Sequence, residues 1–389
     1  MTVAWISDYP IEWMSDPPSE LRDAQKQHPA TWMPVLLEEL QKRAGLKVRV
    51  VVLRKTVPKD FEFQRGDIAF HVIKTHAGLR APSLFWMDTV LIRRALQRFK
   101  PDLVHAWGTE RGAALVASRL EWPSVVTMQG LLSWYGELIP LSLHERFAAL
   151  LERMSLRHAS VVTTESRFAV NYLRQRYPSL RVRQAEHAPN WLFHRLERRP
   201  QTAPVRFITV GTVAYRKGSD LLLRALGRLV NEMPFELTVI GAPDRALLTA
   251  LRSELPVAFW ERIQFKAHLS PAEVAEELAT ATISVLPTRA DTSPNAVKEA
   301  VVAGVPVVAT RVGGVVDYVV HGENGLLVDS EDLDGLTEAL RQAARHPLFG
   351  QGRVDAETCR RMRDYLSPER MAQNFCAAYE AALDQANAR

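Results

Sequence analysis

The sequence has little cysteine and no long apolar run. Cys359 and Cys376 are the two cysteines among 389 residues, too few for a disulfide framework or a cysteine-rich zinc site. No stretch approaches the roughly 20 apolar residues that cross a bilayer. The first residues also lack a basic segment followed by an apolar run and a cleavage site. These absences favour a cytoplasmic protein over a disulfide-stabilised secreted one.

Neither sign of charge dominates the composition. Lys and Arg number 49 and Asp and Glu 44, a net charge of +5 that argues against a dedicated nucleic-acid binder. The charge is uneven, because residues 1–199 carry 29 basic and 20 acidic side chains (+9) and residues 200–366 carry 18 and 21 (−3). The excess positive charge of the first half has two equally good explanations. It is either an ordinary solvated basic surface or a surface that meets an anionic partner, such as a phosphorylated acceptor or membrane head groups.

Strand-like apolar runs alternate with helical patterns in both halves, which predicts an α/β protein with parallel sheets covered by helices. The polar segment 195–204 separates two such series, and the length suits two domains with a binding cleft between them. A capping box is expected at Ser270 and Glu273. A final helix after Ser367 and Pro368 is expected to carry Met371, Phe375, Ala378 and Tyr379 on one face. The expected strands cover 3–6, 48–53, 102–106, 124–128, 160–164, 205–210, 236–240, 282–286, 305–310 and 325–328.

Polar residues follow three successive strands of the second half, where ligands of open parallel sheets bind. After 205–210, Arg216 and Lys217 precede a helix N-terminus, a place that favours an anion such as phosphate. An exposed loop lysine is the plainer interpretation of the same segment. After 305–310, Gly313 and Gly314 would let backbone amides approach a ligand closely.

The strand 282–286 leads into a further polar loop and helix. Ser293 is predicted to be the N-cap and Pro294 the first helical residue, so that the amides of Asn295 and Ala296 point into the crevice.

Two carboxylates flank this helix start. Asp291 and Glu299 are eight positions apart, and both are aimed at the same space because helical side chains lean toward the N-terminus. Carboxylates accept hydrogen bonds from sugar and ribose hydroxyls. The alternative for Glu299 is an ordinary helix-surface charge, although the apolar run Ala300–Val302 favours a buried helix.

The segments 216–220, 291–299, 303–310, 313–314 and 322–328 together resemble glycosyltransferase family 4. The family consists of retaining enzymes with the GT-B fold, two Rossmann-like parallel-sheet domains that face each other across a cleft. The resemblance covers nearly the whole chain and is most specific over 205–330. It implies an acceptor-side domain over 1–199, a nucleotide-sugar-binding domain over 200–366, and a helix over 367–389 that crosses back to the N-terminal domain.

The resemblance also implies individual roles. Lys217 matches the lysine that neutralises the donor diphosphate, Glu299 the residue that holds the ribose hydroxyls, and Asp291 the acidic residue that faces the donor sugar. The main chain at 294–296 would contact the sugar and that of His268 the base. The expected donor contacts are Gly211, Thr212, Arg216, Lys217, His268, Ser293, Pro294, Asn295, Ala296, Glu299, Gly313 and Gly314.

The sequence departs from the family pattern at several positions. Thr212 replaces an arginine, whose charge Arg216 is a candidate to supply, and Asp291 replaces a glutamate. Gln129 replaces a histidine, and the glycine-rich loop after the first strand is missing, with Ser7–Pro10 in its place. These changes leave open a non-catalytic sugar-nucleotide binder, and a nucleotide-sugar epimerase of the same fold is a further alternative.

The activity that the resemblance implies is hexosyl transfer from a nucleotide-diphosphate sugar, with UDP favoured over GDP, front-face attack and no metal. Lys217, Asp291, Glu299 and Gln129 form the expected catalytic set, in which Gln129 orients sugar or acceptor. The acceptor is unidentified, with a phosphorylated, lipid-linked or polysaccharide acceptor all open and nucleic acid not expected. Its weaker candidate contacts are His28, Trp32, Thr109, Glu110 and Trp134.

Three further features bear on the function. The apolar segment 131–143 is either buried against helices or a membrane-facing lip of a peripheral protein. The pair Asp332 and Asp334 fits helix capping better than a metal-held diphosphate. No glycine fingerprint follows 3–6 or 205–210, which argues against a nicotinamide-dependent oxidoreductase.

Overall fold

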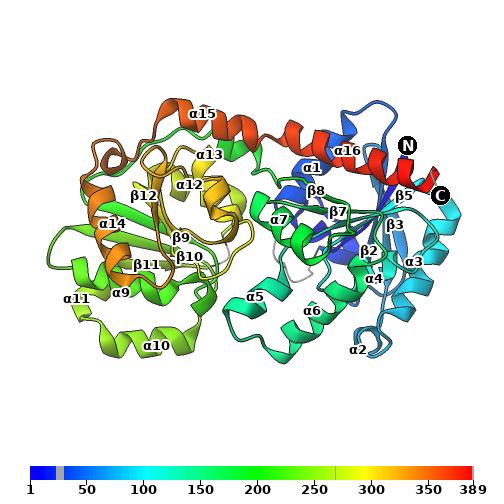
Figure 1. Cartoon of the computed structure of the whole chain (residues 1–389), viewed down its shortest axis with the longest axis horizontal. Helices are drawn as coiled ribbons and strands as arrows, with labels where there is room; N and C mark the ends of the chain where they lie inside the picture. The colour runs from blue at the N-terminus through cyan, green and yellow to red at the C-terminus, as the bar shows by residue number, and fades with distance from the viewer. Residues whose placement is uncertain (23–29, 268, 388–389) are drawn as a thin grey trace. The chain divides into compact units, whose positions relative to one another are not determined.

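The computed structural model describes residues 1–22, 30–267 and 269–387. The chain folds as two compact units (Figure 1). Unit 1 comprises Met1–Glu165, Ala169–Glu186 and Met371–Arg389, and unit 2 comprises Ser166–Phe168 and His187–Arg370. The main divisions thus fall at 186/187 and 370/371, beside the expected 199/200 and 366/367. Among the described residues, no helix is both long and apolar enough to span a membrane.

In its described residues, unit 1 is built on an eight-stranded sheet of order β3-β4-β2-β1-β5-β6-β7-β8. All neighbours are parallel except β3, which pairs antiparallel with β4. The central strand β1 reads Val-Ala-Trp-Ile at its buried positions, which suits a strand covered on both faces. The strands are β1 Thr2–Ile6, β2 Lys47–Arg54, β3 Phe61–Arg65, β4 Ile68–Lys74, β5 Leu103–Trp107, β6 Ser124–Thr127, β7 Val161–Thr164 and β8 Val182–Gln184.

Helices connect most of the parallel strands of unit 1, since parallel strands need crossover connections, whereas β2 leads to β4 through β3. Those on one side run α3, α4 and α6, each packed against the next. The helices are η1 Ile11–Trp13, η2 Ser19–Leu21, α1 Trp32–Gln41, α2 Ala77–Arg80, α3 Trp86–Phe99, α4 Ala113–Ala117, α5 Leu132–Leu138, α6 Leu143–Leu156, α7 Arg167–Arg176 and α16 Pro368–Asn387.

The C-terminal helix α16 completes the core of unit 1. Its Tyr379 is fully buried, and the Tyr379 hydroxyl lies 2.8 Å from His105 Nδ1 and accepts a hydrogen bond from Trp5 Nε1 at 3.2 Å. His105 Nε2 lies 2.6 Å from Thr127 Oγ1, so strands β1, β5 and β6 are linked to the helix through one polar network. The four residues expected on one face of this helix (Met371, Phe375, Ala378 and Tyr379) are all buried.

Unit 2 is built on a six-stranded parallel sheet of order β11-β10-β9-β12-β13-β14 in its described residues. The strands are β9 Val205–Val210, β10 Phe235–Ile240, β11 Ile263–Lys266, β12 Ile283–Leu286, β13 Val307–Thr310 and β14 Gly325–Val328. The helices are α8 Trp191–His194, η3 Tyr215–Lys217, α9 Ser219–Leu229, α10 Arg245–Glu254, α11 Val257–Trp260, α12 Pro271–Thr280, α13 Asn295–Val302, η4 Gly313–Asp317, α14 Leu333–Arg345, η5 Phe349–Gln351 and α15 Ala356–Tyr365.

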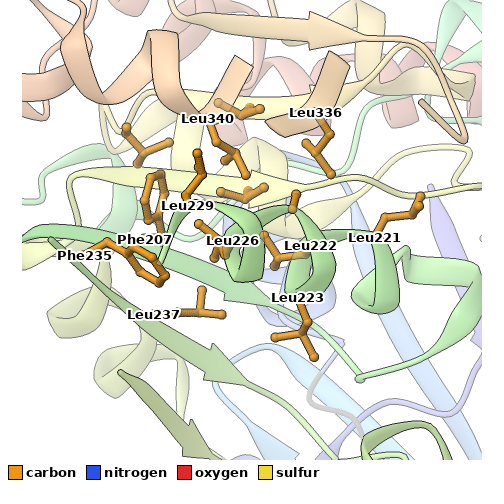
Figure 2. Packing of buried hydrophobic residues seen from close by; sticks show 14 of the residues in the cluster. Phe207, Leu221, Leu222, Leu223, Leu226, Leu229, Phe235, Leu237, Leu336 and Leu340 are labelled. Carbon is orange, nitrogen blue, oxygen red and sulfur yellow. The ribbon is translucent and has the colours of Figure 1, made fainter. Parts of the chain in front are cut away.

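The core on one face of this sheet lies between α9, α14 and the strands (Figure 2). Leu222, Leu226 and Leu229 recur at helical spacing and are all buried. They pack with Leu336 and Leu340 of α14 over the apolar side chains of β9 and β10. Each fully buried leucine side chain contributes about 2 kcal/mol of apolar burial, which fixes α9 and therefore the loop in front of it.

The predicted fold class is confirmed: both units are parallel-sheet α/β domains. Each expected strand is present, and the Ser270–Glu273 capping box forms as predicted. The patterns did not identify β3, β4, β8 or β11. Of these, β3 lies at one edge of the unit 1 sheet, β8 at the other, and β11 at an edge of the unit 2 sheet.

Candidate active site

The candidate site lies at the carboxyl ends of β9, β12 and β13, which are neighbours in the sheet of unit 2. Parallel strands bring the loops that follow them to one edge. The three polar loops identified in the sequence therefore lie at the same edge of the sheet. The order of the strands along the chain does not by itself show that β9, β12 and β13 are neighbours.

The loop after β9 carries the predicted cations and is held by close backbone packing. Gly218 has φ +68°, and a Cβ built there would lie 1.8 Å from the carbonyl oxygen of Pro287. The loop is tied to the same segment by the Arg289 amide, which donates to the Arg216 carbonyl at 2.9 Å. Glycine is therefore required for η3 to reach this position.

Lys217 forms an ion pair with Asp291 across these two loops. The same carboxylate accepts a hydrogen bond from the Ser293 amide at 3.2 Å and lies 4.0 Å from Arg216 Nη1. Arg216 Nη1 donates to the Ala290 carbonyl at 2.8 Å. Two cations and one carboxylate thus meet here, and in this arrangement Asp291 faces Lys217.

The Arg289 side chain holds the loop after β9 in place, a role that the sequence patterns did not predict. Its side chain is buried and donates to both Asp220 carboxylate oxygens, at 2.6 and 3.0 Å. It also pairs with Glu331 and lies 3.7 Å from the ring centroid of Tyr215. Although burial disfavours the charged form, the hydrogen bonds that Arg289 donates to the Asp220 and Glu331 carboxylates raise the pKa of Arg289. No local pattern signals this pairing, because Asp220 and Arg289 are 69 residues apart.

The start of α13 differs from the prediction. The helix covers Asn295–Val302 with Pro294 as its N-cap residue, so the predicted cap at Ser293 is wrong. The Ser293 hydroxyl instead lies 2.7 Å from the Tyr318 hydroxyl, a partner 25 residues away. Within the described chain the amides of Asn295 and Ala296 make no hydrogen bond, which leaves two donors at a positive helix end.

Glu299 lies on α13 with only 8% of its surface exposed. Among the described residues, its carboxyl group makes no hydrogen bond and no ion pair. Burial raises the pKa of Glu299 to about 7, against a smaller lowering by Lys298. A carboxyl group in this state is poised to accept hydrogen bonds from ligand hydroxyls.

Glycines and apolar side chains shape the remaining site. A pocket at the end of β9 is lined by Gly211, Thr212 and Lys217, with Phe265 and Leu286 among its apolar walls. This mixture suits a flat ring next to an anion.

Two glycines follow β13, where the sequence predicted close approach. Gly313 has φ +55°, and its amide makes no hydrogen bond among the described residues. Gly314 donates to the Asp291 carbonyl at 3.3 Å, and a Cβ there would lie 2.1 Å from the Thr292 carbonyl oxygen.

Family models match both halves of the chain. A model described as "Glycosyl transferase 4-like domain" matches residues 33–191, and one described as "Glycosyl transferases group 1" matches residues 204–346. The chain belongs to glycosyltransferase family 4. The resemblance noted in the sequence is thereby confirmed, and the protein is an enzyme of the glycosyltransferase class.

Curated relatives and solved structures agree with this family. The glycogen synthase of Mycobacterium tuberculosis is 26% identical over 334 residues, which cover 82% of this chain and 77% of the relative. The GDP-mannose-dependent alpha-(1-6)-phosphatidylinositol monomannoside mannosyltransferase of Mycolicibacterium smegmatis is 33% identical over 141 residues, 34% of this chain and 36% of the relative.

Two solved structures share the GT-B fold over almost the whole chain. Sucrose-phosphate synthase from Thermosynechococcus elongatus has a TM-score of 0.79 at 17% identity and covers 97% of this chain and 98% of its own. Anabaena HepE in complex with UDP-glucose has a TM-score of 0.69 at 15% identity and covers 98% and 100%. The present glycosyltransferase therefore has the GT-B fold.

The acceptor-side candidates of the transferase lie in unit 1, where Gln129 follows β6 and Glu110 follows β5. A Cβ at Gly108 would lie 2.7 Å from a Glu110 carboxylate oxygen and 3.4 Å from Gln129 Oε1, so this glycine lets the two side chains converge. Glu110 accepts a hydrogen bond from the Thr109 amide at 3.0 Å, and burial raises the pKa of its carboxyl group. Thr109 Oγ1 is buried and has no partner among the described residues.

The other acceptor-side predictions fall in different surroundings. Trp134 on α5 and Trp32 on α1 are both buried, each 8% exposed. Leu131 and Leu132 are buried as well, so the first part of the 131–143 segment packs inside unit 1, while Leu143 at its end is 84% exposed. His28 and His268 lie outside the described residues.

The aspartate pair of the transferase is structural. Asp332 caps α14 by accepting a hydrogen bond from the Gly335 amide at 2.8 Å, and Asp334 pairs with Arg228 at 2.5 Å. The capping interpretation is confirmed. Across the described ranges, no three His, Cys, Asp or Glu side chains gather in a metal-binding group.

Proposed function

We propose that the protein transfers a hexose, with retention at the anomeric carbon, from a nucleotide-diphosphate sugar to a hydroxyl acceptor. UDP-sugars are the favoured donors, front-face attack is the expected course, and no metal is needed. The observation that carries this proposal is the convergence of Lys217 with the free amides at the start of α13 and the buried carboxyl group of Glu299.

The leaving diphosphate needs stabilisation of developing negative charge. Lys217 and Arg216 supply positive charge, and the amides of Asn295 and Ala296 supply donors at a helix end. Because Asp291 pairs with Lys217, donor binding would replace this internal carboxylate by phosphate oxygens. In the proposed mechanism Asp291 then turns to the sugar, and Glu299 accepts hydrogen bonds from the ribose hydroxyls.

The proton of the acceptor hydroxyl is proposed to pass to the leaving phosphate oxygen on the same face of the sugar. Gln129 cannot act as a base but can both donate and accept hydrogen bonds, so it is assigned to orienting sugar or acceptor beside Glu110. HepE has been captured with UDP-glucose, and the mannosyltransferase relative is named as GDP-mannose-dependent. These names support a nucleotide-sugar donor and make GDP the second candidate.

We further propose that unit 1 contacts a membrane surface peripherally. Helix α3 exposes Trp86 (55%), Met87 and Val90 at its start. Arg93 and Arg94 follow one turn later, which produces apolar and basic side chains in sequence along one short helix.

A thermal-unfolding panel with UDP, GDP and ADP tests the donor proposal. The matching nucleoside diphosphate at about 100 times its dissociation constant should stabilise the protein by about 2.7 kcal/mol. Lys217→Ala should lose most of this stabilisation and the release of nucleoside diphosphate from the nucleotide sugar. Lys59→Ala, an exposed lysine of unit 1, should retain both.

The outcomes separate the parts of the proposal. Stabilisation by none of the three nucleotides would refute it. Turnover that is lost with a chelator and restored by a divalent ion would refute metal independence, and an initial sugar product of inverted anomeric configuration, followed by NMR, would refute retention.

A further inference from the structure

A groove of about 440 Å³ runs along the outer edge of β8 in unit 1. β8 is the last strand of its sheet in the part of the chain that the structure describes, and no described strand covers this edge. The volume is within the range of small-molecule binding sites. The groove is lined by Val161, Arg174, Arg181, Val182, Arg183, Gln184, Asn374, Ala377 and Ala381.

Three arginines of this groove carry charges that no carboxylate neutralises. Within the described chain, Arg174, Arg181 and Arg183 take part in no ion pair, whereas Arg176 on the same helix α7 lies 3.7 Å from Glu137. Arg174 Nη2 donates to the Val182 carbonyl at 3.2 Å, which fixes this guanidinium against the strand edge. The groove therefore has a preformed positive potential.

Strand geometry places the other two guanidinium groups together. Arg181 and Arg183 are two positions apart, so they project to the same face of an extended segment, while Val182 between them is only 5% exposed and points into the core. Two side chains on one face of a strand can bind one anion at the same time.

Helix α16 forms the opposite wall and leaves it open. Asn374, Ala377 and Ala381 share one helix face because they are spaced three and four positions apart. The small side chains of Ala377 and Ala381 leave space in the groove, and Asn374 places a side-chain amide on its wall. Among the described residues, no carboxylate lines the groove. Glu186 is buried and accepts a hydrogen bond from Gln184 Nε2 at 2.7 Å.

The groove is separate from the residues assigned to sugar transfer. Val161 begins β7 and Arg181 precedes β8, so much of the groove lies at the amino ends of these strands. Gln129 and Glu110 follow the carboxyl ends of β6 and β5. An anion in the groove would therefore not be the group that receives the sugar.

We propose that this groove binds the phosphate group of a phosphorylated polyol, as an accessory site distinct from the transfer site. Arginine forks suit phosphate oxygens in a bidentate geometry, and Asn374 provides an amide for a hydroxyl. The space exceeds that of a single phosphate, so part of the polyol is accommodated as well. A soluble sugar phosphate and a phospholipid head group share this chemistry.

The test compares Arg181→Gln/Arg183→Gln with Arg43→Gln/Arg157→Gln, a matched pair of exposed unit 1 arginines outside the groove. Both are made in the full chain with Lys217→Ala, so that the donor site does not bind the probes. Inorganic phosphate, a hexose 6-phosphate, and vesicles of phosphatidylcholine with and without phosphatidylglycerol are the probes. Affinity is measured by calorimetry for the first two and by co-sedimentation for the vesicles.

The groove variant should bind inorganic phosphate and hexose phosphate at least about tenfold more weakly than the control pair, since each lost charged hydrogen bond matters. Vesicle binding that falls in the groove variant alone assigns a lipid head group. Unchanged vesicle binding with lost phosphate binding assigns a soluble ester. Two outcomes would overturn the proposal. One is equal binding of every probe by the two variants, and the other is no binding of any probe by the Lys217→Ala protein whose groove arginines are intact. Unfolding without ligand verifies that both variants fold.

Discussion

The buried carboxyl group of Glu299 is the clearest case of a residue that folding alone does not satisfy. Its pKa is raised to about 7 by burial, from 4.5. Below pH 4.5 the Glu299 carboxyl group is protonated in both the folded and the unfolded protein, so it does not change the free energy of unfolding there. As pH rises from about 4.5 to about 7 the unfolded protein loses this proton first, and the free energy of unfolding falls. The penalty above pH 7 is roughly 3 kcal/mol. Such a penalty is typical of a group kept for function.

Glu299→Gln should therefore stabilise the free protein at pH 8 and have little effect at pH 4.5, as measured by urea unfolding at both values. The same substitution should lower the affinity for the nucleoside diphosphate by at least about tenfold, because the ribose hydroxyls lose a charged hydrogen-bond acceptor. Binding to the wild type should strengthen between pH 6 and pH 8 more than binding to the variant, since the nucleotide titrates equally in both. A variant with unchanged affinity would remove Glu299 from the donor site.

At the residue scale, sequence patterns predicted the site composition but not its pairings. Lys217 and Asp291 were both assigned from local motifs, yet their ion pair joins positions 74 apart. The Ser293 cap failed for the same reason, because the Tyr318 hydroxyl competes for the serine. Partners distant in the chain leave no local periodicity or turn signal, so only the assembled sheet reveals them.

Among the elements, η3 depends on one glycine. Gly218→Ala should lower the free energy of unfolding by about 1–3 kcal/mol, because a left-handed backbone and a clash with Pro287 both oppose a Cβ. Nucleoside diphosphate affinity should fall with it, because Lys217 moves with the loop.

Gly322→Ala is the matched control for this prediction. Gly322 also has positive φ, +86°, but its Cβ would meet nothing within 4 Å. Gly322→Ala should lower the free energy of unfolding by only about 1 kcal/mol and leave the affinity for the nucleoside diphosphate unchanged. Equal loss of affinity in both variants, or none in Gly218→Ala, would contradict the assigned role of the loop.

The elements themselves were predictable to different degrees. The buried parallel strands read as short runs rich in β-branched residues, and all of those expected were found. The β3–β4 hairpin was missed although Phe61–Arg65 alternates and Gly66 supplies a turn with φ +55°. β8 was missed because it is three residues long and carries one exposed and one half-buried polar position, too few to establish a period.

For the whole molecule, the membrane proposal predicts a measurable association. Trp86→Ser/Val90→Ser should reduce co-sedimentation with vesicles containing anionic lipid by at least about tenfold, because each buried apolar side chain contributes on the order of 2 kcal/mol. Val257→Ser, equally apolar and 76% exposed in unit 2, should have no effect. Negligible sedimentation of the wild type at low salt would refute the membrane contact.

The place of α16 has a consequence for how the chain is made. The Tyr379 hydroxyl is part of the polar network around His105 in unit 1, yet it is synthesised after the whole of unit 2. A nascent chain that has released only residues 1–186 must leave His105 Nδ1 and the apolar surface under α16 exposed to solvent. Unit 2, whose residues are complete by position 370, is then able to close during translation before unit 1, which still needs α16.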